Sequence, residues 1–204
     1  MAHIPDGILS APVLIGGAVL AVGGVALGLR RLTDQAIPKT AILSAAFFAG
    51  SLIAIPVGPS SVHLLLSGLM GLMLGFGAFP AVAVALMLQA LLFGFGGLTT
   101  LGVNTFNIAL PGVLLALAFG PAIRSARSPA TRMAMAASVG ALAVLGTGGL
   151  VAVSLALSSS DYTPVASVLL ATYLPLAIGE AFVTAAVVGF LARVRPEALS
   201  PALS

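Results

Sequence analysis

Long, uninterrupted runs of apolar residues make up most of the chain, and short polar stretches separate them. A membrane-spanning helix needs about 20 mostly apolar residues. The runs are continuous rather than alternating, which favours helices over the strands of a membrane barrel. We therefore predict an all-α integral membrane protein, a single domain (residues 1–204) with about seven transmembrane helices. The predicted spans lie near 8–29, 40–57, 62–76, 79–97, 106–123, 130–157 and 165–192.

Composition supports this interpretation. Of the 204 residues, 60% are hydrophobic and only 6% are charged, whereas a soluble domain has about 25% charged residues. The chain has no cysteine, which excludes disulfides and thiolate metal sites. The net charge is +3, but on a membrane protein such cations more often set orientation than bind nucleic acid. We predict no nucleic-acid partner.

The lysine and arginine side chains fall into three groups, which follow the first, fifth and seventh predicted spans. With the amino terminus outside, all eight cations lie on the cytoplasmic side, as the positive-inside rule requires. We therefore expect an outer amino terminus and a cytoplasmic carboxyl terminus. The eight cations are Arg30, Arg31, Lys39, Arg124, Arg127, Arg132, Arg193 and Arg195.

The same arrangement brings the only two histidines, His3 and His63, to the outer face. Ionisable groups in a membrane protein are candidates for function. If Met1 is removed, the amine of Ala2, the amide nitrogen of His3 and its ring Nδ1 could chelate one metal ion, with His63 as the fourth nitrogen ligand. If Met1 is retained, the amine, two amides and His3 already supply four nitrogens, and His63 becomes optional.

A planar set of four nitrogens suits Ni²⁺ or Cu²⁺, and Co²⁺ could also be accommodated. Mg²⁺ and Ca²⁺ prefer oxygen ligands and fit this set poorly.

The remaining polar candidates are less specific. Asp6, in a Pro-Asp-Gly turn, could add a hydrogen bond or a charge to the site, or could cap the first span. Gln89 lies in the fourth span, and Asn104 and Asn107 are expected in the outer loop before the fifth. The glycine- and threonine-rich stretch 93–102 predicts a packed, non-helical segment.

Small residues recur along one side of the first span, at Gly17, Ala21, Gly24 and Gly28. This spacing permits close helix packing, either within the chain or against a partner subunit. Sequence motifs for nucleotide binding, for a hydrolase nucleophile and for a zinc protease are absent. We therefore predict that the chain is not an enzyme and that energy for uphill transport would come from another subunit.

Four motifs resemble one family. They are "HIPDG" (3–7), "GPSSVHLLLSGLMGLMLG" (58–75), "LQALLFGFGGLTTLGVNTFN" (88–107) and, more loosely, "LPLAIGEAFVTA" (174–185). The chain resembles the cobalt/nickel substrate-binding membrane subunits of energy-coupling factor transporters, the CbiM/NikM family. The resemblance implies a seven-helix fold in the bacterial inner membrane that captures Ni²⁺ or Co²⁺ from outside, with no further cofactor.

The resemblance also implies partners: a scaffold membrane subunit, cytoplasmic ATPase subunits and a small auxiliary membrane subunit. The amino-terminal nitrogens, His3 and His63 match the metal ligands of the family. Positions around its pocket are matched by Ser60, Ser61, Gln89, Asn104 and Asn107. The chain departs from the family in placing Ala2 before the histidine, which removal of Met1 would correct, and in having Ala181, not glycine, after Glu180.

Other interpretations remain open at this point. A stand-alone metal channel or secondary permease would use Glu180 and Gln89 along its path, and metal transport by the chain alone would favour it. Glu180 could instead only hydrogen-bond a neighbouring helix. A membrane-embedded enzyme would use His63 and Asp6 as acid and base, and a purely structural subunit would bind no ligand.

Overall fold

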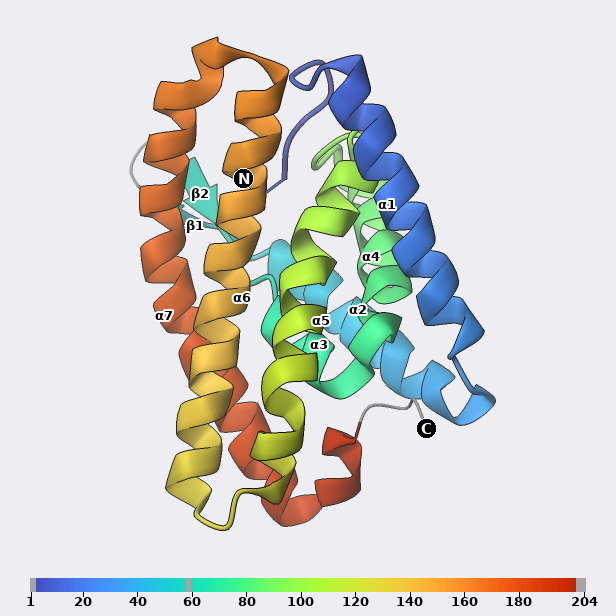
Figure 1. Cartoon of the computed structure of the whole chain (residues 1–204), viewed down its shortest axis with the longest axis vertical. Coiled ribbons are helices and arrows are strands. Elements are labelled where there is room, and N and C mark those ends of the chain that lie inside the picture. The colour runs from blue at the N-terminus through green and yellow to red at the C-terminus, as the bar shows by residue number, and fades with distance from the viewer. Residues whose placement is uncertain (1–2, 58–59, 201–204) are drawn as a thin grey trace.

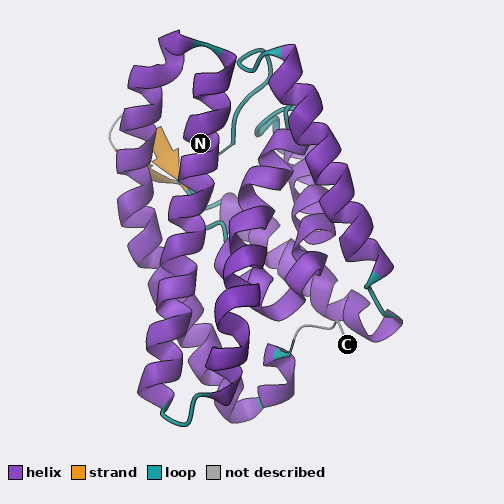
Figure 2. Ribbon diagram, viewed as in Figure 1, coloured by secondary structure: helices purple, strands orange, loops and turns teal. Residues whose placement is uncertain are grey.

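The computed structural model of the protein describes residues 3–57 and 60–200, without the side chains of residues 55–61 and 166–170. The described part is a bundle of seven α-helices with one short hairpin (Figures 1 and 2). The helices are α1 (Ala11–Arg30), α2 (Ile37–Ser51), α3 (Ser67–Leu74), α4 (Ala78–Phe93), α5 (Leu101–Ser125), α6 (Pro129–Ser158) and α7 (Thr163–Val194). The hairpin pairs β1 (Ile55–Val57) with β2 (Ser60–Val62) in antiparallel register.

Five runs are long and apolar enough to cross a membrane, which confirms the prediction of an all-helical membrane protein. One of them joins α3 and α4 through a turn at Gly75–Gly77. The five runs are Ala11–Arg30, Ser67–Phe93, Leu101–Ser125, Pro129–Ser158 and Ala171–Val194.

The predicted spans 40–57 and 62–76 differ from the structure. α2 has 15 residues and α3 only eight, so they rise about 22 Å and about 12 Å against a hydrocarbon core of about 30 Å. Neither helix is long enough to span the core by itself. Between them the chain forms the hairpin and a non-helical turn that contains His63. A run of apolar residues does not reveal where a buried chain leaves the helical conformation.

α3 lies in the middle of the bundle, and all eight of its residues are buried (Figure 1). Glycines allow this close packing. A Cβ at Gly68 would meet the backbone of Gly140 in α6, and a Cβ at Gly71 would collide with the carbonyl of Gly112 in α5. Backbones that approach so closely require residues without side chains. The packing fixes the position of α3 and of the turn that precedes it.

The small residues of α1 pack inside the chain. Gly17 lies against α5, whereas Gly24 and Gly28 lie against α4 and the turn before it. Ala21 is buried on the same side. Of the two possibilities that the spacing left open, internal packing is the one that the structure adopts.

Apart from the hairpin between α2 and α3 and the turn between α3 and α4, the connections of the bundle lie at its two ends (Figure 1). The start of α1, the segment between α4 and α5, and the α6–α7 connection lie at the upper end. The α1–α2 connection, the α5–α6 loop and the end of α7 lie at the lower end. All eight cations belong to the lower segments or to the helical turns next to them. The basic residues are thus grouped in space as the sequence predicts.

Candidate metal site

The rings of His3 and His63 lie against each other, although 60 positions separate them in the chain. Their Nε2 atoms are 3.1 Å apart, and their ring centroids are 4.8 Å apart. Each histidine is only 5% exposed. Phe47 of α2 flanks the pair, with its centroid 6.4 Å from each imidazole. The sequence placed the two histidines at one level of the membrane, and the structure brings them into contact.

Hydrogen bonding determines where the ring protons lie. Nδ1 of His63 is 3.0 Å from the carbonyl oxygen of Leu64. A carbonyl only accepts, so this Nδ1 carries the hydrogen and Nε2 of His63 presents a lone pair. Nε2 of His3 must then donate to it. Nδ1 of His3 therefore carries no hydrogen, and this buried atom has no hydrogen-bond partner among the described residues.

Both imidazoles are neutral at physiological pH. Burial lowers the pKa of His3 to about 3, and the neighbouring His63 acts in the same direction. Burial also lowers the pKa of His63, although its hydrogen bond to Leu64 opposes the shift. Metals bind imidazole in its neutral form. The pair is therefore ready to coordinate a cation without first losing a proton to solvent.

Asn104 of α5 holds the chain next to His3. Its Oδ1 accepts from the N–H of Ile4 at 3.0 Å, and its Nδ2 donates to the carbonyl of Ile4 at 3.0 Å. The hydroxyl of Thr100 donates to the same carbonyl at 2.8 Å. Both polar groups of the Ile4 backbone are satisfied by side chains, which fixes the residue that follows His3.

Sequence reasoning did not single out Thr100 or Phe47. Thr100 lies within the glycine- and threonine-rich stretch, which was expected only to be non-helical and packed. Nothing in the sequence distinguishes Phe47 from the other phenylalanines of the chain.

Asp6 ties the amino-terminal segment to the turn before α5. Its carboxylate accepts from the N–H groups of Leu98 (3.1 Å), Thr99 (3.0 Å) and Thr100 (3.3 Å) and from the Thr99 hydroxyl (2.5 Å). The hydroxyl of Thr99 is the main cause that lowers the pKa of Asp6. The expectation that Asp6 caps the first span is wrong, because its carboxylate is engaged at α5 and Ser10 occupies the N-cap position of α1.

The bonds to Asp6 also explain where α5 begins. Asn104 and Asn107 were expected in a loop, but α5 starts at Leu101 and contains both. Thr100 makes no side-chain cap to the helix. The carboxylate of Asp6 instead supplies acceptors and a negative charge at the helix start, where both are favourable. The expected non-helical segment is confirmed for residues 94–100.

Two other candidates, Asn107 and Gln89, are buried in α5 and α4. Nδ2 of Asn107 donates to the hydroxyl of Ser154 in α6 at 3.2 Å, so this side chain joins two helices. Gln89 is completely buried in α4. Neither its amide oxygen nor its amide nitrogen has a partner within the described part of the chain.

The remaining candidates cannot be compared with the structure. Met1 and Ala2 lie outside the described residues, and so do the side chains of Ser60 and Ser61. The backbone of β2 places Ser61 opposite Pro56. Among the described residues, no group of three or more histidine, cysteine, aspartate or glutamate side chains could hold a metal ion. A metal at the histidine pair therefore needs ligands other than such side chains.

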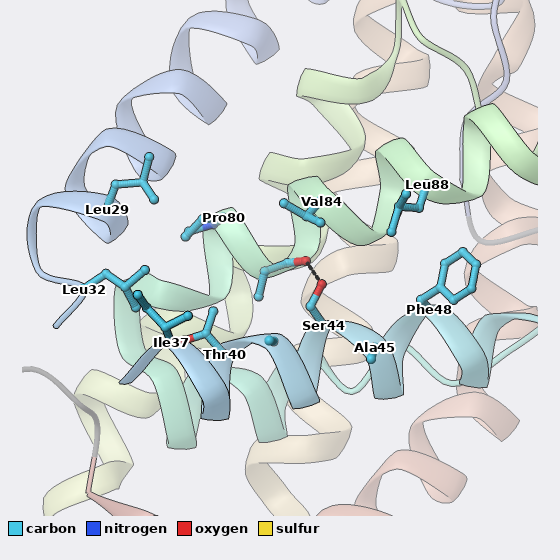
Figure 3. Close-up of a pocket in the computed structure, with 12 residues that line it drawn as sticks. Leu29, Leu32, Ile37, Thr40, Ser44, Ala45, Phe48, Pro80, Val84 and Leu88 are labelled. Carbon is cyan, nitrogen blue, oxygen red and sulfur yellow. Dashed lines mark hydrogen bonds between the residues drawn. The ribbon is translucent and has the colours of Figure 1, made fainter. Parts of the chain in front are cut away.

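A groove of about 390 Å³ lies elsewhere, between the end of α1, α2 and α4 (Figure 3). Its lining is almost entirely apolar. The hydroxyl of Ser44 is already bonded to the carbonyl of Ala81 at 2.7 Å, and that of Thr40 to the carbonyl of Ala36 at 2.9 Å. Such a lining offers no free ligand to a metal ion, so the histidine pair remains the candidate site.

Comparison with known proteins identifies the family of the chain. Residues 3–198 match the family described as "Cobalt uptake substrate-specific transmembrane region", CbiM. This chain belongs to the CbiM family. A relative in Haemophilus influenzae, named as a candidate metal transport protein, is 38% identical over 199 residues, which is 97% of each chain. The "Fused nickel transport protein NikMN" of Rhodobacter capsulatus is 29% identical over 98% of this chain and 64% of its own length.

The fold is shared with a solved structure. The crystal structure of a transition metal transporter superposes with a TM-score of 0.78 at 26% identity, and the match covers 94% of this chain and 93% of the other. The chain is therefore a multi-pass transmembrane component of cobalt or nickel uptake and not an enzyme. Membership of the CbiM family also implies that the chain works within a transporter complex.

Proposed function

We propose that this chain is the substrate-capture subunit of an energy-coupling factor importer in the bacterial inner membrane, and that it binds Ni²⁺ or Co²⁺ from outside. The observation that supports the proposal most is the buried, neutral pair of His3 and His63. His3 precedes the start of α1, whereas the cations lie at the α1–α2 connection, at the α5–α6 loop and at the end of α7. By the positive-inside rule, that arrangement favours an outer amino terminus and a cytoplasmic carboxyl terminus.

The proposed ligand set combines side chain and backbone. With Ala2 as the first residue, its amine, the His3 amide nitrogen and Nδ1 of His3 bind the ion, and Nε2 of His63 completes the set. The lone pair on Nδ1 of His3, which no described residue engages, supports this choice of ring atom. Four nitrogen ligands favour late first-row divalent ions over Mg²⁺ and Ca²⁺. With Met1 retained, the terminus and His3 alone supply four nitrogens.

Residues around the ligands hold them in place. Asn104 and Thr100 fix Ile4, so His3 approaches the ion from a constrained backbone. Asp6 anchors the next turn to the start of α5. We assign Gln89, Ser60, Ser61 and Asn107 to the surroundings of the pocket, where Gln89 has two polar atoms to offer.

The energy for uptake comes from partners in this proposal. The chain has no nucleotide-binding motif, so cytoplasmic ATPase subunits would act on it through a scaffold membrane subunit, with a small auxiliary membrane subunit completing the importer. The single transmembrane domain (residues 1–204) would deliver the ion to the inner side. Uptake by this chain expressed without any partner would contradict the assignment and favour a stand-alone permease.

A titration with Ni²⁺ tests the proposal. The purified protein, with a free amino terminus, should develop the visible band of square-planar nickel and saturate at about one equivalent. His63→Ala should weaken binding at least about tenfold if intact mass shows that Met1 is removed, and much less if it is retained. A wild-type protein that gives no saturable band would overturn the proposed function.

A further inference from the structure

The turn that carries His63 contains a strained residue. Leu66, immediately before α3, has φ 51° and ψ 18°, and it is the one non-glycine residue with positive φ among those described. Leucine rarely adopts this left-handed conformation, because its Cβ crowds the backbone. Such a conformation persists only when surrounding contacts enforce it.

The enforcing contact comes from the far end of the chain. Oε1 of Glu180, in α7, accepts from the backbone N–H groups of both Leu65 and Leu66, the latter at 2.7 Å. Glu180 is completely buried. These N–H groups precede α3 and have no partner within a helix, so the carboxylate satisfies donors that would otherwise be buried and unpaired.

One peptide group connects Glu180 to the imidazole of His63. The N–H of Leu65 and the C=O of Leu64 belong to the same peptide bond, which is planar and rigid. Its N–H donates to Glu180, and its C=O accepts from Nδ1 of His63. The carboxylate thus fixes the plane of this peptide, and the peptide fixes both the orientation and the tautomer of the ring.

We propose that Glu180 is a positioning residue for His63: it holds the Nε2 lone pair of His63 toward His3 through the Leu64–Leu65 peptide. The proposal rests on the metal-binding function proposed above. Ligating histidines in metal sites are commonly oriented by a hydrogen bond at their second nitrogen, and loss of that partner weakens metal binding. Here the partner is the carbonyl of Leu64, and Glu180 accepts from the N–H of the same peptide group.

Two substitutions of Glu180 distinguish the effect of the position of Oε1 from the effect of the carboxylate charge. Glu180→Gln keeps an oxygen where Oε1 lies and removes the charge, whereas Glu180→Asp keeps the charge and withdraws the oxygen by one methylene. Thr184→Val is the matched control. Thr184 lies one turn later on α7, is also completely buried, and its hydroxyl has no hydrogen-bond partner in the described residues, so its removal leaves the turn at Leu65 and Leu66 untouched.

The first measurement uses the metal-free full-length protein with a free amino terminus. Amide hydrogen exchange at Leu65 and Leu66 should be about tenfold faster in Glu180→Asp than in the wild type, because their acceptor has moved. Glu180→Gln and Thr184→Val should exchange at nearly the wild-type rate. Fast exchange in Glu180→Gln would overturn the proposal, since the oxygen would then not be the restraining group.

The second measurement is a Ni²⁺ titration of the same proteins. Glu180→Asp should raise the Kd about tenfold and shift or broaden the visible band, whereas Glu180→Gln should stay within about threefold of the wild type. Equal losses in both variants would show that the charge matters and would overturn the positioning role. Wild-type binding and an unchanged band in Glu180→Asp would also overturn it. A wild-type protein that binds no Ni²⁺ would instead contradict the proposed function, whatever the exchange rates show.

Discussion

The side chain of Asn104 pairs with the backbone of Ile4 through two hydrogen bonds, both of 3.0 Å. The pair works as a short piece of β-ladder in which a side-chain amide replaces a strand. It joins the amino-terminal segment to the first turns of α5, next to the histidine pair. An amide that both donates and accepts is needed for it, and aspartate or leucine could not satisfy both groups.

We predict that Asn104→Leu weakens Ni²⁺ binding about tenfold or more, because two buried backbone groups of Ile4 lose their partners. Thr147→Val is the control: Thr147 is completely buried in α6, and its hydroxyl donates to the carbonyl of Ala143 in the same helix. Its Kd should stay within about threefold of the wild type. Equal effects of the two substitutions in a Ni²⁺ titration would contradict a specific role for Asn104.

Two residues, Gly-Ser, added before Met1 should raise the Kd for Ni²⁺ at least about tenfold, since the extension moves the amine away from His3. The same two residues added after Ser204 serve as the control and should leave binding unchanged. Circular dichroism should give the same helix content for both proteins. Undiminished affinity in the extended protein would exclude the amine as a ligand.

The bonds of Asp6 predict a pH dependence. Hydrogen bonds from Thr99 lower the pKa of this carboxyl in the folded protein, so its contribution is complete above the unfolded pKa of about 3.9 and is lost as the pH falls through the lower, folded value. The amide chemical shift of Thr99 should therefore be constant from neutral pH to about pH 4 and change only below it.

Asp6→Ala should abolish that low-pH transition and speed amide exchange at Leu98, Thr99 and Thr100 at neutral pH. Asp161→Ala, a substitution of another exposed aspartate near the start of a helix, should leave both measurements unchanged. A transition that persists without Asp6 would assign it to another group.

Close packing of α3 predicts that Gly71→Ala destabilises the fold by about 2–4 kcal/mol, because the added methyl collides with the carbonyl of Gly112. Gly149→Ala in α6 is the control, since a Cβ there would meet nothing within 4 Å. It should be neutral or stabilise by up to about 1 kcal/mol. Thermal unfolding in detergent measures both, and equal Tm values would contradict the packing argument.

Features that depend on local composition could be predicted from the sequence. The apolar runs indicated about seven transmembrane helices. The described part of the chain has seven α-helices, but only five of its helical runs are long and apolar enough to cross a membrane. The cations indicated which connections share an end of the bundle, and the spacing of Gly17, Gly24 and Gly28 indicated a packing face. The candidate ligands His3 and His63 followed from their rarity and from the predicted level of the membrane.

Features that depend on distant partners could not be predicted. The start of α5 is stabilised by Asp6, which lies more than 90 residues earlier in the chain. The turn after His63 is not helical, and the N–H groups of Leu65 and Leu66 in it donate to Glu180, more than 110 residues later in the chain. A single sequence contains the residues of such pairs but not their pairing, so the short α3 was read as a full span.

The contact between the two imidazoles has a consequence for which ions the site would accept. The hydrogen on Nε2 of His3 occupies the lone pair of His63 that a cation would use. A cation that binds Nε2 of His63 would therefore have to replace the hydrogen bond between the two imidazoles. Ions with weak affinity for nitrogen gain too little from that exchange, whereas Ni²⁺ and Co²⁺ gain more. Discrimination against the abundant Mg²⁺ and Ca²⁺ would then depend on this hydrogen bond as much as on the ligand set.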